Sequence, residues 1–291
     1  MYELIRLAYT NMIINIIGRK TLFWAGMFVA LNFLQAQENR NEKSGPEYEK
    51  VENEFPKDPD AIRILTYNVR HCRGVDGIID YERITRIISD LDADFVCLQE
   101  LDSMTQRSGK IDQVKLLGEM TGMHSYFGRA INYQGGKYGI GILSREEAEK
   151  TYNYALPGNE KRTVLVAEFP DFIVMSTHLD LEAKHRFESI QIITQKARLF
   201  DKETFIAGDF NEGDFSSDVF AELEKDWKLV SPTDNTCPTG NPDKSIDFVL
   251  TLKRARENNY KPSKTAVVYS LPNVNVSVAS DHYPVFCDFF Q

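Results

Sequence analysis

The segment 205-FIAGDFNEGDF-215 changes from apolar to acidic within a few positions. Residues 204–210 have the composition of a buried strand, which leaves its sheet near Asp209. An Asx-rich turn is a common way to end such a strand, so Asp209 and Asn211 have an ordinary structural explanation. The alternative is that they lie at the strand end to serve a metal ion and a phosphate. Side-chain alternation puts both on one face, with Phe210 in the core.

The rest of the chain predicts two packed sheets with helices outside them. Strand-like segments are rich in β-branched and aromatic residues and are bounded by Gly, Pro or Asp. Besides 204–210 they are residues 62–69, 94–100, 138–144, 163–169, 172–179, 245–251, 265–270 and 283–290. Apolar residues at helical spacing predict helices over 80–91, 110–122, 181–200 and 218–225. Hairpin-like pairs of strands separate the helices, so a simple βαβ repeat is excluded and an α/β (α+β) sandwich is favoured.

The N-terminus predicts export. A basic pair, Arg19-Lys20, precedes thirteen almost wholly apolar residues (22–34) and a small residue, Ala36. This pattern is typical of a signal peptide, here residues 1–36, and directs the protein to the periplasm or the extracellular space. The apolar run is short for a permanent membrane anchor, although an uncleaved membrane-associated segment is the alternative. The polar, Pro-containing residues 37–60 then predict a flexible lead-in to a single domain at 61–291.

The charge balance argues against tight binding of nucleic acid. The chain has 34 Lys and Arg against 43 Asp and Glu, a net charge of −9. Residues 1–36 carry a net +2, so their removal leaves about −11. Proteins that track along nucleic acid depend on cationic contacts with phosphates. A phosphorylated substrate needs only a metal ion or a few local cations. The candidates near a site mouth are Lys137, Arg145, Lys161, Arg162, Lys184, His185 and Arg186.

Cysteine usage does not predict a zinc site. An exported protein could pair its four cysteines. However, Cys97 and Cys287 lie inside strand-like runs, where a buried thiol is the commoner explanation. CxxC spacings and an HExxH motif are both missing from the sequence, so a zinc hydrolase is disfavoured. We expect a monomer.

Polar residues recur at the ends of the predicted strands. They are Asn68, Arg70, Glu100, His178, Asp209, Asn211, Asp247, Asp281 and His282. Each alone can be a cap or a satisfied structural side chain, but the set fits phosphoester hydrolysis. A glutamate offers the hard oxygen that Mg²⁺ prefers. Two histidines can serve as a general base and as a donor to a phosphoryl oxygen, and asparagine amides can donate to developing charge.

Seven motifs in order carry a resemblance to a known family. The series TYNVR, CLQE, KYGIGILSR, STHLD, GDFN, SIDFVL and SDHYPV resembles the endonuclease/exonuclease/phosphatase superfamily, from deoxyribonuclease I to sphingomyelinases. Each motif alone is weak, but the order is specific, and the match spans residues 62–290. The motif spacing and export signal look most like small secreted bacterial members. The resemblance implies a four-layer α/β sandwich, with two mixed β-sheets face to face and helices on both outer faces.

The resemblance also implies roles for the metal and phosphate groups. Glu100 corresponds to the principal divalent-metal ligand, with Asn68 beside it, and we count Asp281 as a further candidate ligand. Arg70 stands where some relatives have a second metal-binding Asp, which favours an arginine on the phosphate. Tyr138 matches a phosphate-contacting tyrosine of some members, or it is a packing aromatic at a strand edge.

The implied catalytic residues are His282, Asp247, Asp209, His178 and Asn211. His282 corresponds to the catalytic histidine, and Asp247 to the acid that orients it. Asp209 corresponds to the acid that positions or deprotonates the attacking water, while Asn211 and His178 contact the scissile phosphate. Whether Asp209 or His282 takes the proton stays open. Glu212 and Asp214 are expected outside the site.

The function this predicts is metal-assisted hydrolysis of a phosphoester by in-line attack of water. The expected cofactor is Mg²⁺, with Mn²⁺ or Ca²⁺ as alternatives. A small or lipid-derived phosphodiester or phosphomonoester is the favoured substrate. A secreted nuclease is the second hypothesis. The third, from another class, is an inactive module that binds a phosphorylated ligand or a protein.

Overall fold

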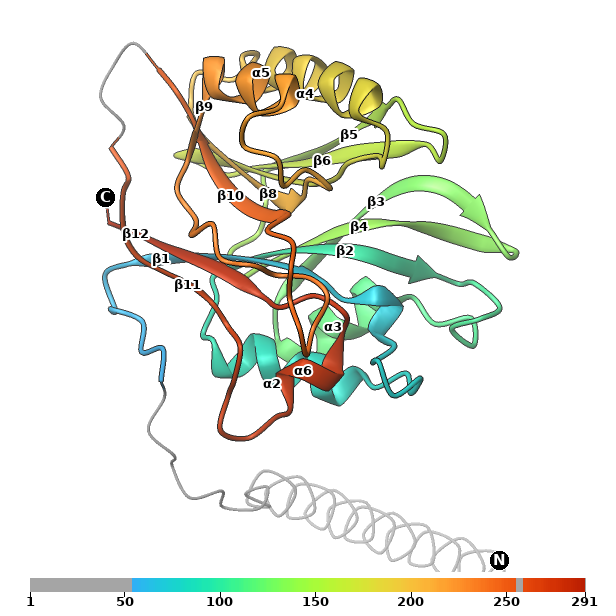
Figure 1. Cartoon of the computed structure of the whole chain (residues 1–291). Coiled ribbons are helices and arrows are strands. Elements are labelled where there is room, and N and C mark those ends of the chain that lie inside the picture. The colour runs from blue at the N-terminus through green and yellow to red at the C-terminus, as the bar shows by residue number, and fades with distance from the viewer. Residues whose placement is uncertain (1–53, 255–258, 291) are drawn as a thin grey trace, which may run out of the picture. The chain divides into compact units, whose positions relative to one another are not determined.

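A computed structural model describes residues 54–254 and 259–290 (Figure 1). Two six-stranded mixed sheets form the centre of the described domain. The first has the order β11-β12-β1-β2-β4-β3 and comprises β1 (Ile62–Asn68), β2 (Phe95–Ser103), β3 (His124–Tyr133), β4 (Gly136–Ser144), β11 (Lys261–Val267) and β12 (Val285–Phe290). The second has the order β5-β6-β7-β8-β10-β9 and comprises β5 (Lys150–Leu156), β6 (Arg162–Glu168), β7 (Phe172–His178), β8 (Glu203–Asp209), β9 (Trp227–Leu229) and β10 (Asp247–Leu252).

Helices cover the outer face of each sheet (Figure 1). The first sheet is covered by α2 (Tyr81–Asp90), α3 (Gln113–Thr121) and α6 (Val276–Ala279), and the second by α4 (Ala183–Ala197) and α5 (Asp218–Asp226). A 3-10 turn, η1 (Arg70–Cys72), follows β1. The predicted four-layer sandwich is therefore confirmed.

Three apolar cores hold these layers together. One lies under α2, where Ile84, Ile87 and Ile88 are buried, because the apolar spacing of this helix places them on one face. A second lies under α4 and α5. The third joins the two sheets and contains Phe205 of the opening segment. Phe210 is buried in the core under α4 and α5, as side-chain alternation predicted.

Strand direction brings the functional residues to one edge of the sandwich. β1 and β2 are parallel, and so are β7 and β8, with His178 opposite Asp209. β10 runs antiparallel to β8 and begins with Asp247, also opposite Asp209. β12 runs antiparallel to β1, so the residues just before it lie where β1 ends. This edge therefore brings together the ends of β1, β2, β7 and β8 and the starts of β10 and β12.

The structure corrects several predicted boundaries. Sequence patterns missed β3, β5, β9 and α6, and β11 begins at Lys261 rather than at residue 265. The expected lead-in is also shorter, since residues 54–60 lie against the domain. The Phe55 ring is 5.6 Å from that of Phe286, and Lys57 Nζ is 2.7 Å from Asp94 Oδ1. The domain therefore begins before residue 61.

The predicted signal peptide lies outside the described residues. Within the described ranges, none of the helices has the length and apolar character to cross a membrane. All four cysteines are free thiols, and Cys72, Cys97 and Cys287 are buried.

Candidate active site

Asp209 lies at the centre of the polar edge. The residue is 1% exposed, and its carboxylate accepts a hydrogen bond from Asn68 Nδ2 at 3.1 Å. The same oxygen, Oδ2, lies 3.5 Å from His178 Nε2 and 3.8 Å from His282 Nε2. Three of the predicted residues thus converge on one carboxylate from β1, β7 and the segment before β12.

His282 and Asp247 form a buried pair. Nδ1 of the histidine is 2.9 Å from Oδ2 of the aspartate, which also accepts a 2.5 Å hydrogen bond from the Thr236 hydroxyl. Burial disfavours a charged imidazole, but the Asp247 carboxylate and its hydrogen bond outweigh that cost and hold the pKa of His282 well above its usual value. This shift favours the imidazolium form of His282.

His178 has the opposite protonation state. Its side chain is buried, and this desolvation lowers the pKa of His178 to about 4, although the Asp209 charge works in the other direction. His178 is therefore a neutral imidazole near pH 7. Environments that push the pKa values of two like groups apart are a common way to assign them different roles in catalysis.

Glu100 is placed by an irregularity in β2. The pairing of β2 with β4 shifts register between Leu98 and Leu101, and Glu100 has a left-handed φ of 61°. Such bulges redirect side chains, and here one carboxylate oxygen reaches Asn68 Nδ2 at 3.3 Å. Burial raises the pKa of Glu100, while the hydrogen bond from Asn68 opposes that shift.

Asn211 is held by the strands around it. Its backbone N–H donates to Asp209 Oδ1 at 2.9 Å, and its side-chain amide donates to the Leu179 carbonyl at 2.9 Å. Asn211 also has a positive φ of 49°, a conformation that asparagine tolerates well. One N–H of this amide is thus committed to the protein.

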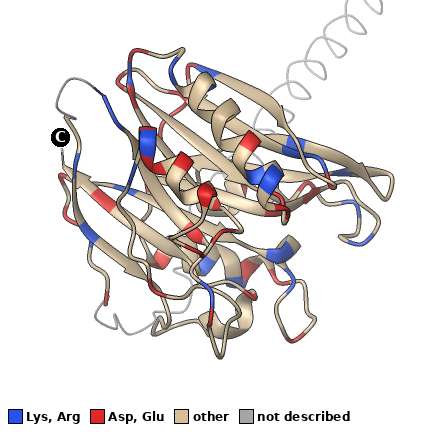
Figure 2. Ribbon diagram, turned by 45° about the horizontal axis from the view of Figure 1, so that its top comes forward, with Lys and Arg blue, Asp and Glu red and all other residues tan. Residues whose placement is uncertain are grey.

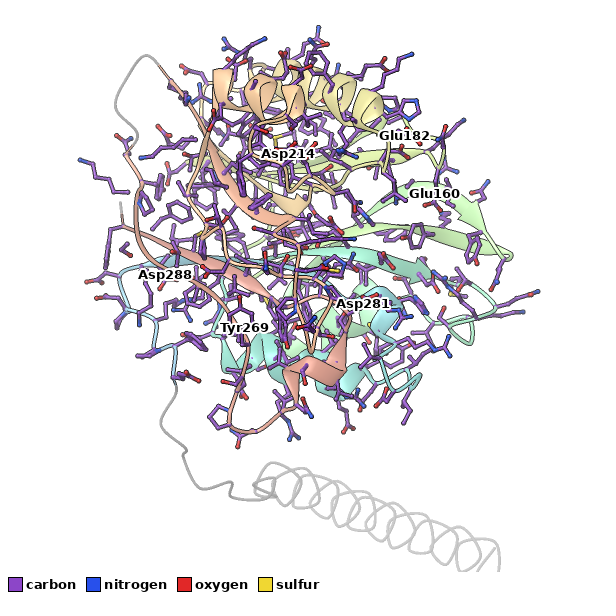
Figure 3. The ribbon with its side chains drawn as sticks, viewed as in Figure 1. Glu160, Glu182, Asp214, Tyr269, Asp281 and Asp288 are labelled. Carbon is purple, nitrogen blue, oxygen red and sulfur yellow. The ribbon has the colours of Figure 1, made fainter. Side chains whose placement is uncertain are left out.

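Arg70 and Asp281 pair with each other at the rim. Arg70 Nε lies 3.4 Å from Asp281 Oδ2, and each side chain is more than one third exposed. Figure 3 labels Asp281 on the segment before β12. Arg70 follows β1 in a turn of three residues with positive φ. From the sequence, Arg70 was expected to bind phosphate and Asp281 to bind the metal ion. In the structure the two side chains contact each other.

Tyr138 packs against other side chains. It is 9% exposed, its ring lies 6.4 Å from that of Tyr133, and the Arg107 guanidinium lies 5.6 Å from its centre. These contacts fit the packing interpretation, while the contact of Tyr138 with phosphate stays a prediction.

Hard donors are available for a divalent ion. Among the described residues, ligand atoms of Asp209, Asp247 and His282 lie within 4.8 Å of one another. Two of these three already share a hydrogen bond, which leaves Asp209 with free ligand capacity. Asn68 Nδ2 links Asp209 to Glu100. These carboxylate oxygens suit Mg²⁺, Mn²⁺ or Ca²⁺ better than a soft metal.

Two supporting hydroxyls were missed by sequence reasoning. Thr236 lies in a loop without a periodic pattern, so nothing local signals its contact with Asp247. Ser280 Oγ donates to the Asn68 carbonyl at 2.7 Å, and its place beside the SDH motif was an available signal.

Several of the cations expected near the mouth have acidic partners, and Arg186 and Arg145 are committed to structural ones. Arg186 is buried, and its Nη2 lies 3.0 Å from Glu212 Oε2. Glu212 is therefore the structural partner of Arg186, which agrees with the expectation that Glu212 lies outside the site. Arg145 follows β4 at the end where β2 begins, opposite the polar edge, and pairs with Asp92.

Comparisons with known proteins agree on one family. The sequence model of the Endonuclease/Exonuclease/phosphatase family matches residues 65–282. Among solved structures, an endonuclease/exonuclease/phosphatase from Beutenbergia cavernae DSM 12333 is 21% identical with a TM-score of 0.63, over 80% of this chain and 72% of that one. No curated protein sequence matches.

Two further solved structures differ in what their names describe. Mannosyl-6-phosphatase from Bacteroides thetaiotaomicron VPI-5482 is 16% identical with a TM-score of 0.64, over 79% of this chain and all of that one (100%). TDP2 from D. rerio, complexed with a single-strand DNA product, is 16% identical with a TM-score of 0.61, over 79% of this chain and 99% of that one. At such identities the likeness shows the fold alone.

Proposed function

The chain belongs to the endonuclease/exonuclease/phosphatase family, whose members are phosphoric ester hydrolases, and on that premise we propose that it is a Mg²⁺-dependent phosphoesterase acting on a small or lipid-derived substrate. One observation carries the proposal. The Asp209 carboxylate faces two histidines, His178 and His282, and is held by Asn68. A module that only binds a ligand would not need this whole set of side chains, with Asp247 also positioned behind His282.

The charged state of His282 favours Asp209 as the group that takes the proton from water. An imidazolium has no nitrogen that can accept a proton, whereas the Asp209 carboxylate can accept one on an oxygen. His282 then donates to a phosphoryl oxygen, with Asp247 holding its ring. His178, neutral and buried, donates a second hydrogen bond.

Glu100, Asn68 and Asp209 are the residues that would hold the ion. A divalent ion there offsets charge on the phosphoryl oxygens and lowers the pKa of water. The ligand atoms of the ion would be oxygens, as Mg²⁺ requires. Arg70, at the rim of the site, adds a second positive charge.

The substrate class rests on charge. Figure 2 shows Lys and Arg interspersed with Asp and Glu over the described part of the chain, rather than gathered in one basic stripe. With a net charge of −9, this favours a small or lipid-derived phosphoester over a long nucleic acid. We further propose export through residues 1–36, which N-terminal sequencing of the mature protein from the culture medium or periplasm would test.

A substrate panel tests the activity. Bis-para-nitrophenyl phosphate, sphingomyelin, inositol phosphates and plasmid DNA are assayed with Mg²⁺, Mn²⁺, Ca²⁺ or EDTA, with Asp209→Asn as the inactive control. EDTA-sensitive turnover of a small or lipid substrate supports the proposal. Faster cleavage of plasmid than of any small ester assigns a nuclease instead. If no substrate gives turnover that EDTA removes, the binding module is the better description.

A further inference from the structure

A cavity of about 420 Å³ lies between the two sheets beside the active site. One wall is β3, with Arg129 and Asn132, and the other comes from Asn153 of β5 and from Lys161 and Arg162 at the start of β6. Gly128 lets the two walls approach. A Cβ at this position would lie 2.9 Å from Asn153 Oδ1 and 2.9 Å from Leu165 Cβ, closer than real contacts allow.

The cavity lining is cationic. Arg129, Lys161 and Arg162 line it, and its lining includes no Asp or Glu. Two acids lie close to Arg162. Glu160 Oε2 is 3.3 Å from Arg162 Nη1, and Figure 3 shows Glu160 at the end of the second sheet near β3. Asp180 also interacts electrostatically with Arg162. Three cations in the lining against these two acids leave an excess of positive charge in a protein that is acidic as a whole.

Arg162 has unused hydrogen-bonding capacity. It is only 7% exposed, and its Nε is buried without a hydrogen-bond partner. A buried N–H without a hydrogen-bond partner costs free energy. Native proteins therefore rarely leave such a group without a ligand or a water molecule as its acceptor. An anion in the cavity would match the positive charge of the three cations that line it.

The same residue connects the cavity to the active site. β6 and β7 pair with Val164 opposite Thr177, so Arg162 lies beside the end of β7, next to His178. Consistent with this position, the Arg162 charge contributes, after burial, to the lowered pKa of His178. A ligand that spans from Asp209 to the cavity would therefore pass Arg162.

We propose that Arg129, Lys161 and Arg162 form a second anion subsite, which binds a second phosphate group carried by the substrate. This inference rests on the proposed function and narrows it to phosphoesters that bear a further phosphate away from the bond that is cleaved. A guanidinium suits this task because it can make paired, charge-assisted hydrogen bonds with phosphate oxygens. The cavity holds no reacting group, so its role is binding and orientation.

Binding measurements test the subsite separately from turnover. Calorimetry compares alkanediol bisphosphates of increasing chain length with the matching hydroxyalkyl monophosphates. We expect the wild type to bind the best bisphosphate at least about tenfold more tightly, the gain typical of a hydrogen bond to a charged group. Arg162→Gln and, independently, Lys161→Gln should remove most of that preference. Lys150→Gln, an exposed lysine at the other end of the β5–β6 pair, is the matched control and should keep it.

Any other outcome contradicts the proposed second anion subsite. Equal weakening of monophosphate and bisphosphate in Arg162→Gln would place Arg162 on the scissile phosphate alone. A wild type without preference, or with a preference kept in Lys161→Gln and in Arg129→Gln, would show that no second phosphate binds there. Circular dichroism confirms folding of each variant. Hydrolysis of bis-para-nitrophenyl phosphate is measured in parallel, so that loss of the proposed function is seen independently of the binding preference.

Discussion

His282 Nδ1 lies 2.9 Å from Asp247 Oδ2 in a buried pair, and this contact sets the charge of the histidine that faces Asp209. Burial favours the neutral ring, and the Asp247 carboxylate is the largest influence that opposes it, ahead of a hydrogen bond with Cys237 and the Asp209 charge. The pair therefore fixes both the orientation of His282 and its proton.

Asp247→Asn should lower kcat by about 10²- to 10⁴-fold, the usual range for loss of general acid–base function. The pKa of His282 should fall, and NMR titration of its ring measures this directly. Asp243→Asn, at an exposed position in the loop just before β10, is the control. Unchanged titration of His282 in a folded Asp247→Asn variant would contradict the role of the pair.

The same pair predicts a pH dependence of stability. Because the folded-state pKa of His282 is raised, its contribution to the free energy of unfolding is fully present below about pH 6.5, the unfolded value. The contribution is lost as pH rises through the folded pKa. Thermal unfolding of the wild type and of His282→Gln across pH should show the two curves converging at high pH.

His178 should act without titrating in the neutral range. His178→Ala is expected to reduce kcat by about 10²- to 10³-fold, the cost of removing one donor to developing charge. Since its pKa is lowered to about 4, His178 contributes no step to the pH–rate profile above pH 5. His124→Ala, at an exposed position, is the control. A profile in which the His178→Ala variant loses a step near pH 6 to 7 would show that His178 is the titrating group.

Thr236 is a positioning residue for Asp247. Thr236→Val removes a buried hydroxyl that donates to Asp247 Oδ2, at a cost of about 1 to 3 kcal/mol. We expect lower kcat with little change in KM, together with a shifted pKa of His282. Thr236→Ser should restore most of the activity, and Thr151→Val, an exposed threonine, is the control. If Thr236→Val lowers stability but leaves the pKa of His282 unchanged, the role of Thr236 is structural only.

Residues at the ends of central strands were predictable because several signals coincide there. Asp209, His178 and Glu100 each follow an apolar run, and the order of the motifs matches the family. β3 and β5 were missed because they are edge strands, half exposed, so their sequences lack a continuous apolar run. The sequence carries no local sign of the Arg70–Asp281 contact, since the two residues are far apart in the chain.

Stability should depend strongly on a buried ion pair far from the active site. Arg63 is fully buried and lies 2.6 Å from Asp288 Oδ1, on neighbouring strands β1 and β12. Arg63→Met leaves a buried carboxylate unpaired and should lower the free energy of unfolding by about 3 to 5 kcal/mol. The double variant Arg63→Met/Asp288→Leu should recover much of the loss, because it removes both charges. Denaturant unfolding measures this, and a double variant no more stable than Arg63→Met would show that packing dominates.

Binding of the divalent ion should be visible as thermal stabilisation that depends on Glu100. An ion that binds only the folded state adds about 2.7 kcal/mol when its concentration is 100 times Kd. Mg²⁺ should therefore raise Tm of the wild type, and EDTA should reverse the shift. Glu100→Gln keeps the size of the side chain but loses its charge, so the Mg²⁺-induced shift should largely disappear and activity should fall with it. Glu119→Gln, exposed on α3, should respond like the wild type. An undiminished Mg²⁺ shift in Glu100→Gln would place the ion on other residues, with Asp209 and the cluster around it as the next to be substituted.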